Sequence, residues 1–186
     1  MNIINFLYRL LLTFNSTSLI IVIFLVKEGC VIGDVYPNLY FLPTYVSYII
    51  YFLIPVVLTY VSLLISRWLD NDSIMKEDNK PVIIEVEQAN NAFLPSYLGY
   101  FFVALSVTYS DTLIFVFGIL FLFTYFSQTL YFNPLFLLFR FHFYYLTTCN
   151  KTKIFLITRK QMNDPDIVEL PKLKRINSFT FIDKKK

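Results

Sequence analysis

The stretch TYVSYIIYFLIPVVLTYVSLLI, residues 44–65, decides the class of fold. It carries no charge and is long enough to cross the hydrocarbon core of a bilayer as a helix, which takes roughly 20 residues. Three more apolar stretches occupy residues 4–26, 92–109 and 112–132. The chain is 56% hydrophobic with a mean hydropathy of +0.58, which is too apolar for a soluble domain of 186 residues. The sequence therefore predicts an α-helical membrane protein with four transmembrane helices.

Two of these stretches admit another interpretation. Residues 92–109 form the shortest, for which a re-entrant or interfacial segment is the alternative. The first stretch has the charge pattern of a signal peptide, but Lys27-Glu28-Gly29 closes it without a small-x-small cleavage site, which favours a retained helix. A break at Asn15-Ser16, with residues 3–14 lying flat on the membrane, also stays open.

The Lys and Arg residues indicate the orientation. If the N-terminus faces the cytoplasm, so do the loop 66–91 and the tail, and fifteen of the sixteen Lys and Arg residues lie on that side, with Lys27 alone outside. With one span fewer, the basic tail would lie outside, against the tendency of Lys and Arg to stay on the cytoplasmic side. We therefore expect a multi-pass membrane protein with both termini cytoplasmic. Cys30 and Cys149 would then lie on opposite sides and cannot pair.

The chain divides into a transmembrane domain, residues 1–134, and a cytoplasmic β-rich tail, residues 135–186. The tail reads as a hairpin of strands 142–148 and 153–159, a short strand at 167–170 and a last strand at 174–182 with Phe179 and Phe181 on one face. So few strands bury little core. Residues 81–87 read as a further strand on the same side, so either they or a partner protein complete the sheet.

No catalytic constellation is visible, and we expect a protein that is not an enzyme and holds no cofactor or metal. One histidine cannot form a His pair for zinc, and there is no Gly-rich phosphate loop. His142 stands among Phe and Tyr residues and reads as a packed strand or interface residue.

Two groups of polar residues are candidate sites. The first lies within the apolar stretches and suggests helix packing or oligomer contacts through hydrogen bonds, with a pore as the alternative; its members are Asn15, Ser16, Ser18 and Gln128. The second is basic and suggests contact with a partner protein or with anionic lipid; its members are Arg159, Lys160, Lys172, Lys174 and Arg175.

The order of parts and the tail resemble a known family. Four apolar stretches, a short outer turn at Ser110-Asp111, and a tail reading KIFLITRK (153–160) and LPKLKRINSFTFID (170–183) look like the membrane subunit (KwaA-type) of the two-component Kiwa anti-phage defence system. The resemblance covers the layout of the whole chain. It implies an inner-membrane homo-oligomer, with a tetramer as the expected number, that senses phage at the envelope.

It also implies a soluble, DNA-associated partner subunit on the cytoplasmic face, so we expect contacts with that partner and with lipids and no direct nucleic-acid contact. The leading functional expectation is a non-enzymatic sensor and scaffold. The alternative is a pore-forming or membrane-disrupting effector, suggested by the polar residues of the first stretch.

Overall fold

The computed structural model describes residues 3–74, 82–92, 94–127, 133–165, 168 and 170–183. The chain forms two compact units, which are described separately. Residues 11–61 and 93–133 form a helical unit, and residues 1–10, 62–92 and 134–186 form a unit built around a β-sheet.

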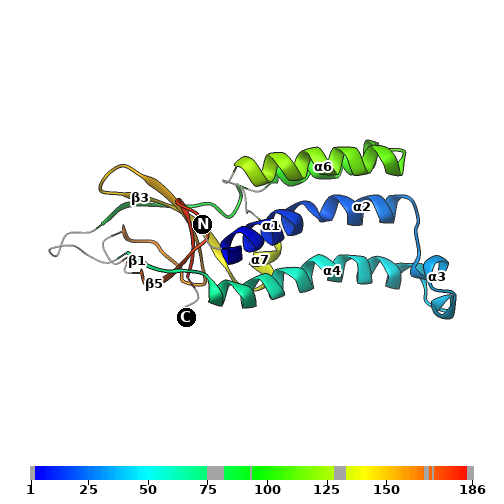
Figure 1. Cartoon of the computed structure of the whole chain (residues 1–186), viewed down its shortest axis with the longest axis horizontal. Coiled ribbons are helices and arrows are strands. Elements are labelled where there is room, and N and C mark those ends of the chain that lie inside the picture. Colours follow the sequence, from blue (N-terminus) through cyan, green and yellow to red (C-terminus); the bar gives the residue numbers. More distant parts are fainter. Residues whose placement is uncertain are drawn as a thin grey trace. The chain divides into compact units, whose positions relative to one another are not determined.

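Three helical stretches are long and apolar enough to cross a membrane (Figure 1): Ile3–Lys27, Thr44–Trp68 and Ser110–Ser127. The first contains α1 (Ile3–Thr17) and α2 (Leu19–Lys27), the second contains α4 (Thr44–Ile65) and the 3-10 turn η2 (Ser66–Trp68), and the third is α6 (Ser110–Ser127). The helix expected at 44–65 is confirmed, and α4 runs through Pro55. The shorter helical elements are α3 (Ile32–Val35), η1 (Pro37–Leu39), α5 (Leu94–Ser106) and α7 (Leu135–Leu138).

Helix α5 has 13 residues and packs along α2 in parallel. Near its start, the Tyr97 hydroxyl donates a hydrogen bond to the Ser16 carbonyl oxygen at 2.9 Å. Just beyond its end, the Val107 carbonyl oxygen accepts a hydrogen bond from Lys27 Nζ. Between these contacts the two helices share an apolar core made of Ile20, Phe24, Ala104, Val107 and Leu113. Helix α5 therefore covers the second half of the α1–α2 stretch and ends level with it.

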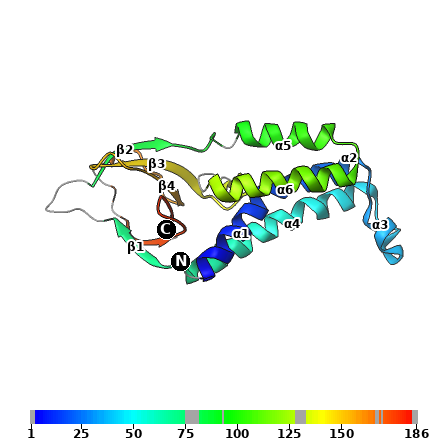
Figure 2. The same ribbon diagram turned by 45° about the horizontal axis from the view of Figure 1, so that its top comes forward.

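The sheet has six strands in the order β1-β5-β6-β4-β3-β2. Figure 2 shows the neighbouring strands β2 and β3 at one end of this order. Their bounds are β1 Asn71–Ile74, β2 Ile83–Gln88, β3 His142–Thr148, β4 Lys153–Thr158, β5 Leu170–Arg175 and β6 Thr180–Asp183. All neighbours are antiparallel except β4 and β6, which run parallel. Both edge strands come from the segment between α4 and α5, and the four inner strands come from the tail.

The sheet is buried on both faces because its central strand, β4, carries apolar residues toward each. One face gathers a cluster around Leu146, Leu156 and Leu173. On the other, Phe136 of α7 packs on Phe143, which stacks on Phe155 with ring centroids 5.7 Å apart. The few strands of the tail would bury little core by themselves, whereas the six-stranded sheet is buried on both faces.

Several predicted strands are confirmed. The hairpin of β3 and β4 is confirmed, and its register places Tyr144 opposite Leu156. The strand expected near 81–87 is β2, which pairs with β3 and places Val86 opposite Leu146. The chain itself therefore supplies the extra strand that the tail needs.

The single strand predicted at 174–182 is wrong. Strand β5 ends at Arg175 and β6 begins at Thr180, and the two pair as antiparallel neighbours. The Asn177 side chain turns the chain by accepting the Phe179 N–H at 2.8 Å, a role for which Asn is suited. Phe179 is accordingly 58% exposed while Phe181 is buried, so they do not share a face as expected.

Strand β1 was not anticipated, because its sequence, NDSI, is polar and has low β-propensity. Pairing with β5 holds it in place. The Asp72 carboxylate accepts two hydrogen bonds from the Arg175 guanidinium, from Nε at 2.8 Å and from Nη2 at 2.7 Å, and Lys174 Nζ donates to the Leu69 carbonyl oxygen at 2.8 Å. Long-range contacts thus override the local preference.

The parallel pair of β4 and β6 is tied by a buried carboxylate. Asp183, at the end of β6, is 2% exposed and lies 3.4 Å from the Thr158 hydroxyl and 3.4 Å from Lys160 Nζ. Removing its charge leaves these groups without their anion.

We predict that Asp183→Asn lowers the free energy of unfolding by about 2 kcal/mol, because hydrogen bonds to a buried charge are the strong ones. The same change at Asp72, whose partner Arg175 is half exposed, is expected to cost less than about 1 kcal/mol. Chemical unfolding of the two variants in detergent measures the difference. Equal losses, or a larger loss for Asp72→Asn, would contradict this reading of the sheet.

Candidate functional site

The five basic residues singled out in the tail have different surroundings. Lys160, Lys174 and Arg175 are held by groups of their own unit: Asp183, the Leu69 carbonyl and Asp72 respectively. Lys172 and Arg159 are exposed, and within the described part of the chain neither is in an ion pair. These two are the residues of the group whose charge is available to a ligand or partner.

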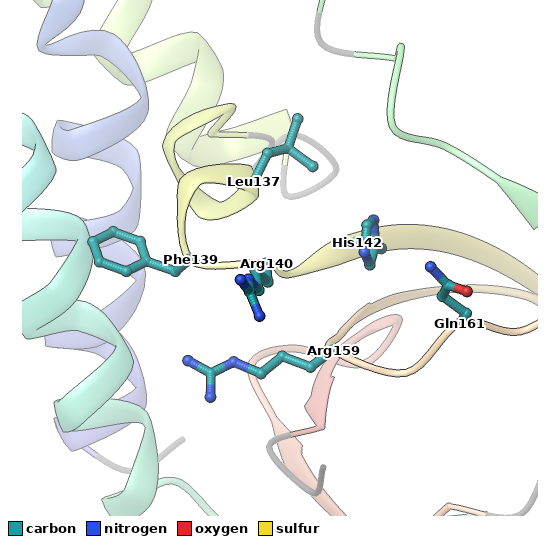
Figure 3. Close-up of a pocket in the computed structure, with 6 residues that line it drawn as sticks. All are labelled: Leu137, Phe139, Arg140, His142, Arg159 and Gln161. Atoms are coloured by element: carbon teal, nitrogen blue, oxygen red, sulfur yellow. The ribbon is translucent and has the colours of Figure 1, made fainter.

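Arg159 lines a pocket of about 560 Å³ in the sheet unit (Figure 3). It directly follows β4, and its guanidinium lies over the Phe141 ring at 4.6 Å from the centroid. A stacked guanidinium keeps its in-plane N–H donors free for an anion. The other described lining residues are Leu137, Phe139, Arg140, His142 and Gln161.

Arg140 reaches the pocket from the turn between α7 and β3 (Figure 3). The turn is a Schellman motif: the Phe141 N–H bonds to the Phe136 carbonyl at 3.1 Å, and the Arg140 N–H to the Leu137 carbonyl at 2.9 Å. The two Phe rings make the apolar contact that accompanies this motif. Arg140 occupies its left-handed position with φ = 61°, where glycine is the usual residue. A side chain is thus kept at a strained backbone position.

His142 is oriented from the β2 side. Asn90 Oδ1 accepts the Phe143 N–H at 2.8 Å, which leaves Asn90 Nδ2 to donate toward His142 Nδ1 at 3.2 Å. In the neutral imidazole this assigns the proton to Nε2. The single histidine is therefore both a strand residue, as expected, and part of the pocket wall.

The polar residues of the helical unit lie together inside it. Asn15 of α1 is fully buried, and the amide orientation that satisfies every neighbour points its oxygen at the Thr59 hydroxyl (2.6 Å) and at Asn133 Nδ2 (2.8 Å). Its Nδ2 then donates to the Pro55 carbonyl oxygen at 3.1 Å. One amide thus joins α1, α4 and the segment after α6 by hydrogen bonds in an apolar surrounding.

The neighbouring hydroxyls are used within α1. Ser16 bonds to the Thr13 carbonyl at 2.9 Å, and Ser18 bonds to the Asn15 carbonyl at 2.8 Å. Such back-bonding competes with the helix, and α1 ends at Thr17, one residue before Ser18. Gln128, the other residue of this group, lies outside the described residues. Because Asn15, Ser16 and Ser18 are buried and bonded inside one chain, they give no support to a pore.

The chemistry open to the pocket is ionic recognition. Among the described residues, no group of three or more His, Cys, Asp or Glu side chains is placed to hold a metal ion. The pocket offers two guanidiniums, an imidazole and an amide against an apolar wall. This arrangement suits an anion better than it suits a bond-making step.

The described part of the chain thus joins helices that are long and apolar enough to span a membrane to a six-stranded sheet with a cationic pocket. A comparison with protein families matches residues 8–182 to the family described as Anti-phage protein KwaA. The match covers nearly the whole chain, and the chain belongs to this family, whose role is anti-phage defence. Neither a curated protein nor a solved structure matches the chain.

Sequence reasoning missed Arg140 as a pocket residue. The run FRFH at residues 139–142 holds two basic side chains and no acid, which was the available signal. Their convergence with Arg159 depends on β3 pairing with β4, where His142 stands opposite Thr158.

We predict that Asn15→Ala lowers the stability of the solubilised protein by about 1 to 2 kcal/mol, since it removes the buried amide that bonds to Thr59, Asn133 and the Pro55 carbonyl. Ser106→Ala is the control, because the Ser106 hydroxyl is exposed and bonds to the Val103 carbonyl of its own helix. Thermal melting in detergent compares the two. A stability of Asn15→Ala that matches the control would contradict a structural role for the amide.

Proposed function

We propose that the chain is a non-enzymatic inner-membrane subunit of an anti-phage defence complex. In this proposal it spans the membrane four times with both termini cytoplasmic, assembles as a homo-oligomer, and recruits a soluble, DNA-associated partner protein to the cytoplasmic face of its sheet. Family membership supports the defence role. The topology and the recruitment rest on the arguments that follow.

The observation that carries the proposal is the composition of the sheet. Strand β2 precedes the α5–α6 pair and strand β3 follows it, yet the two strands are hydrogen-bonded neighbours. Strands β1 and β5 repeat the relation at the other edge. Paired strands cannot form across a bilayer, so both segments lie on one side. Helices α5 and α6 then either both cross the membrane or both stay on one side of it, which supports an even number of spans.

Helix α6 is a candidate span, so α5 must return the chain although it has 13 residues. The parallel contact with α2 supports a crossing: Lys27, at the end of the first candidate span, bonds to the Val107 carbonyl oxygen just past α5. Hence the end of α5 lies at the same depth as the end of that span. The Tyr97 hydroxyl near its start satisfies the Ser16 carbonyl near the end of α1, where a free carbonyl in the membrane interior would be costly.

The lipid-facing surface fits the proposal. Helices α4 and α6 expose large apolar side chains, among them Ile54 and Val57 on α4 and Phe115 and Phe123 on α6. Such faces need lipid or other copies of the chain beside them. The distribution of Lys and Arg supports a cytoplasmic position for the sheet.

The edge strand β2 is the proposed docking edge for the partner. One side of β2 pairs with β3, and its other side is the end of the sheet, which is the geometry that accepts an added strand. It carries an exposed Ile84 beside the acidic Glu85 and Glu87. Strand β1, the other edge, is shorter and more polar.

Co-purification tests recruitment. From cells that co-express the proposed soluble partner, Ile84→Lys is expected to recover severalfold less partner than the unmodified protein, because a charge replaces the exposed apolar side chain of this edge strand. Ser73→Lys places the same side chain at an exposed position of the opposite edge, β1, and is expected to recover the partner normally.

A chain lacking residues 135–186 serves as the second arm. It loses the four inner strands and should recover no partner. Equal recovery from the unmodified protein, Ile84→Lys and the truncated chain would contradict recruitment through the sheet.

A further inference from the structure

We propose that the pocket lined by Arg140, Arg159 and His142 binds the phosphate group of an anionic ligand. This goes beyond recruitment of a protein partner, because it assigns a small-molecule site away from β2. Its volume of about 560 Å³ lies in the range of small-molecule sites, which is roughly 300 to 1,000 Å³.

The charge of the pocket is uncompensated. None of the described residues that line it is acidic, and neither Arg140 nor Arg159 forms an ion pair with a described carboxylate. Three basic residues of the same unit that do have carboxylate partners, Lys153, Lys160 and Arg175, lie outside the lining. Two guanidiniums that line one pocket without a counter-ion among the described residues form a site for a hydrogen-bonded oxyanion such as phosphate.

The fold restrains the side chain of Arg159 and the backbone of Arg140. Stacking on Phe141 restrains Arg159. Arg140 is fixed by the Schellman turn at φ = 61°, a position where glycine would cost less. An arginine at this left-handed position raises the conformational free energy of the backbone, and binding of a ligand to its side chain would offset that cost.

The remaining wall shows what the phosphate is attached to. Leu137 and Phe139 are half-buried and line the pocket beside the arginines, so an apolar group fits next to the anion. A phospholipid headgroup combines these features, and this segment follows closely in the chain on α6, a candidate span. A soluble phosphate compound shares the anionic part and is the other source.

Arg140→Gly separates binding from folding, because glycine suits the left-handed turn while removing the guanidinium. Lys151→Gly is the matched control: Lys151 is also a cation at positive φ, 60°, in the turn between β3 and β4, and it does not line the pocket. Both variants are expected to be at least as stable as the unmodified protein. Arg159→Gln is the second pocket variant.

Lipid adducts of the full chain, purified in detergent, are counted by native mass spectrometry with short-chain phosphatidylglycerol and, as the zwitterionic reference, phosphatidylcholine. Phosphatidylglycerol affinity is expected to fall about tenfold in Arg140→Gly and in Arg159→Gln and to stay unchanged in Lys151→Gly. Inorganic phosphate is titrated separately as the soluble probe.

Phosphatidylglycerol binding that depends on both arginines, with little competition from phosphate, supports a lipid headgroup as the ligand. Phosphate binding that depends on both arginines, with no preference between the two lipids, supports a soluble ligand. Equal binding of both probes by the unmodified protein, Arg140→Gly and Arg159→Gln would overturn the proposal while leaving partner recovery through β2 unaffected.

Discussion

Strand β2 hydrogen-bonds along β3, although α5 and α6 separate the two strands in the chain. The composition of the sheet depends on that pairing and on the corresponding pairing between β1 and β5. Backbone groups of a strand need partners, and a bilayer offers none, so in the proposed membrane topology the two segments share one aqueous side. The segment between α4 and α5 is therefore part of the folded sheet and supplies both of its edge strands.

The helical unit follows the same rule of satisfying polar groups in an apolar surrounding. Asn15 links α1 to α4 and to Asn133, and Tyr97 bonds to the carbonyl of Ser16, which lies one residue before the end of α1. These contacts gather where α1 gives way to α2 and where α5 begins. The polar residues of the first apolar stretch, which are unusual in the sequence, thus provide hydrogen bonds where α1 ends and where α5 begins.

The sequence predicted the parts whose signals are local. Residues 44–65 form a helix with the expected bounds, and the β3–β4 hairpin follows from alternation around a polar turn. Strand β1 could not be predicted, because its residues favour no strand and long-range contacts with β5, among them the Asp72–Arg175 ion pair, hold it in place. The break between β5 and β6 depends on one Asn side chain, and a run of alternating residues conceals it.

The candidate pocket illustrates the same limit. Arg159 was visible as a basic tail residue, but its stacking on Phe141 and its meeting with Arg140 depend on strand register and on one left-handed residue. Likewise, the sequence identified five basic residues without separating them. In the structure, Lys160, Lys174 and Arg175 hold the sheet together, while Arg159 and Lys172 remain exposed.

Labelling with a membrane-impermeant maleimide tests the shared side of the two segments most directly. Three single-cysteine proteins are compared in spheroplasts and in inverted vesicles: one that keeps Cys30, one that keeps the exposed Cys149, and one with Ser73→Cys on β1 as its only cysteine. Cys149 and the cysteine at position 73 should both react only in inverted vesicles, and Cys30 only in spheroplasts. Labelling of positions 73 and 149 from opposite sides would contradict a sheet built from both segments in the membrane-embedded protein.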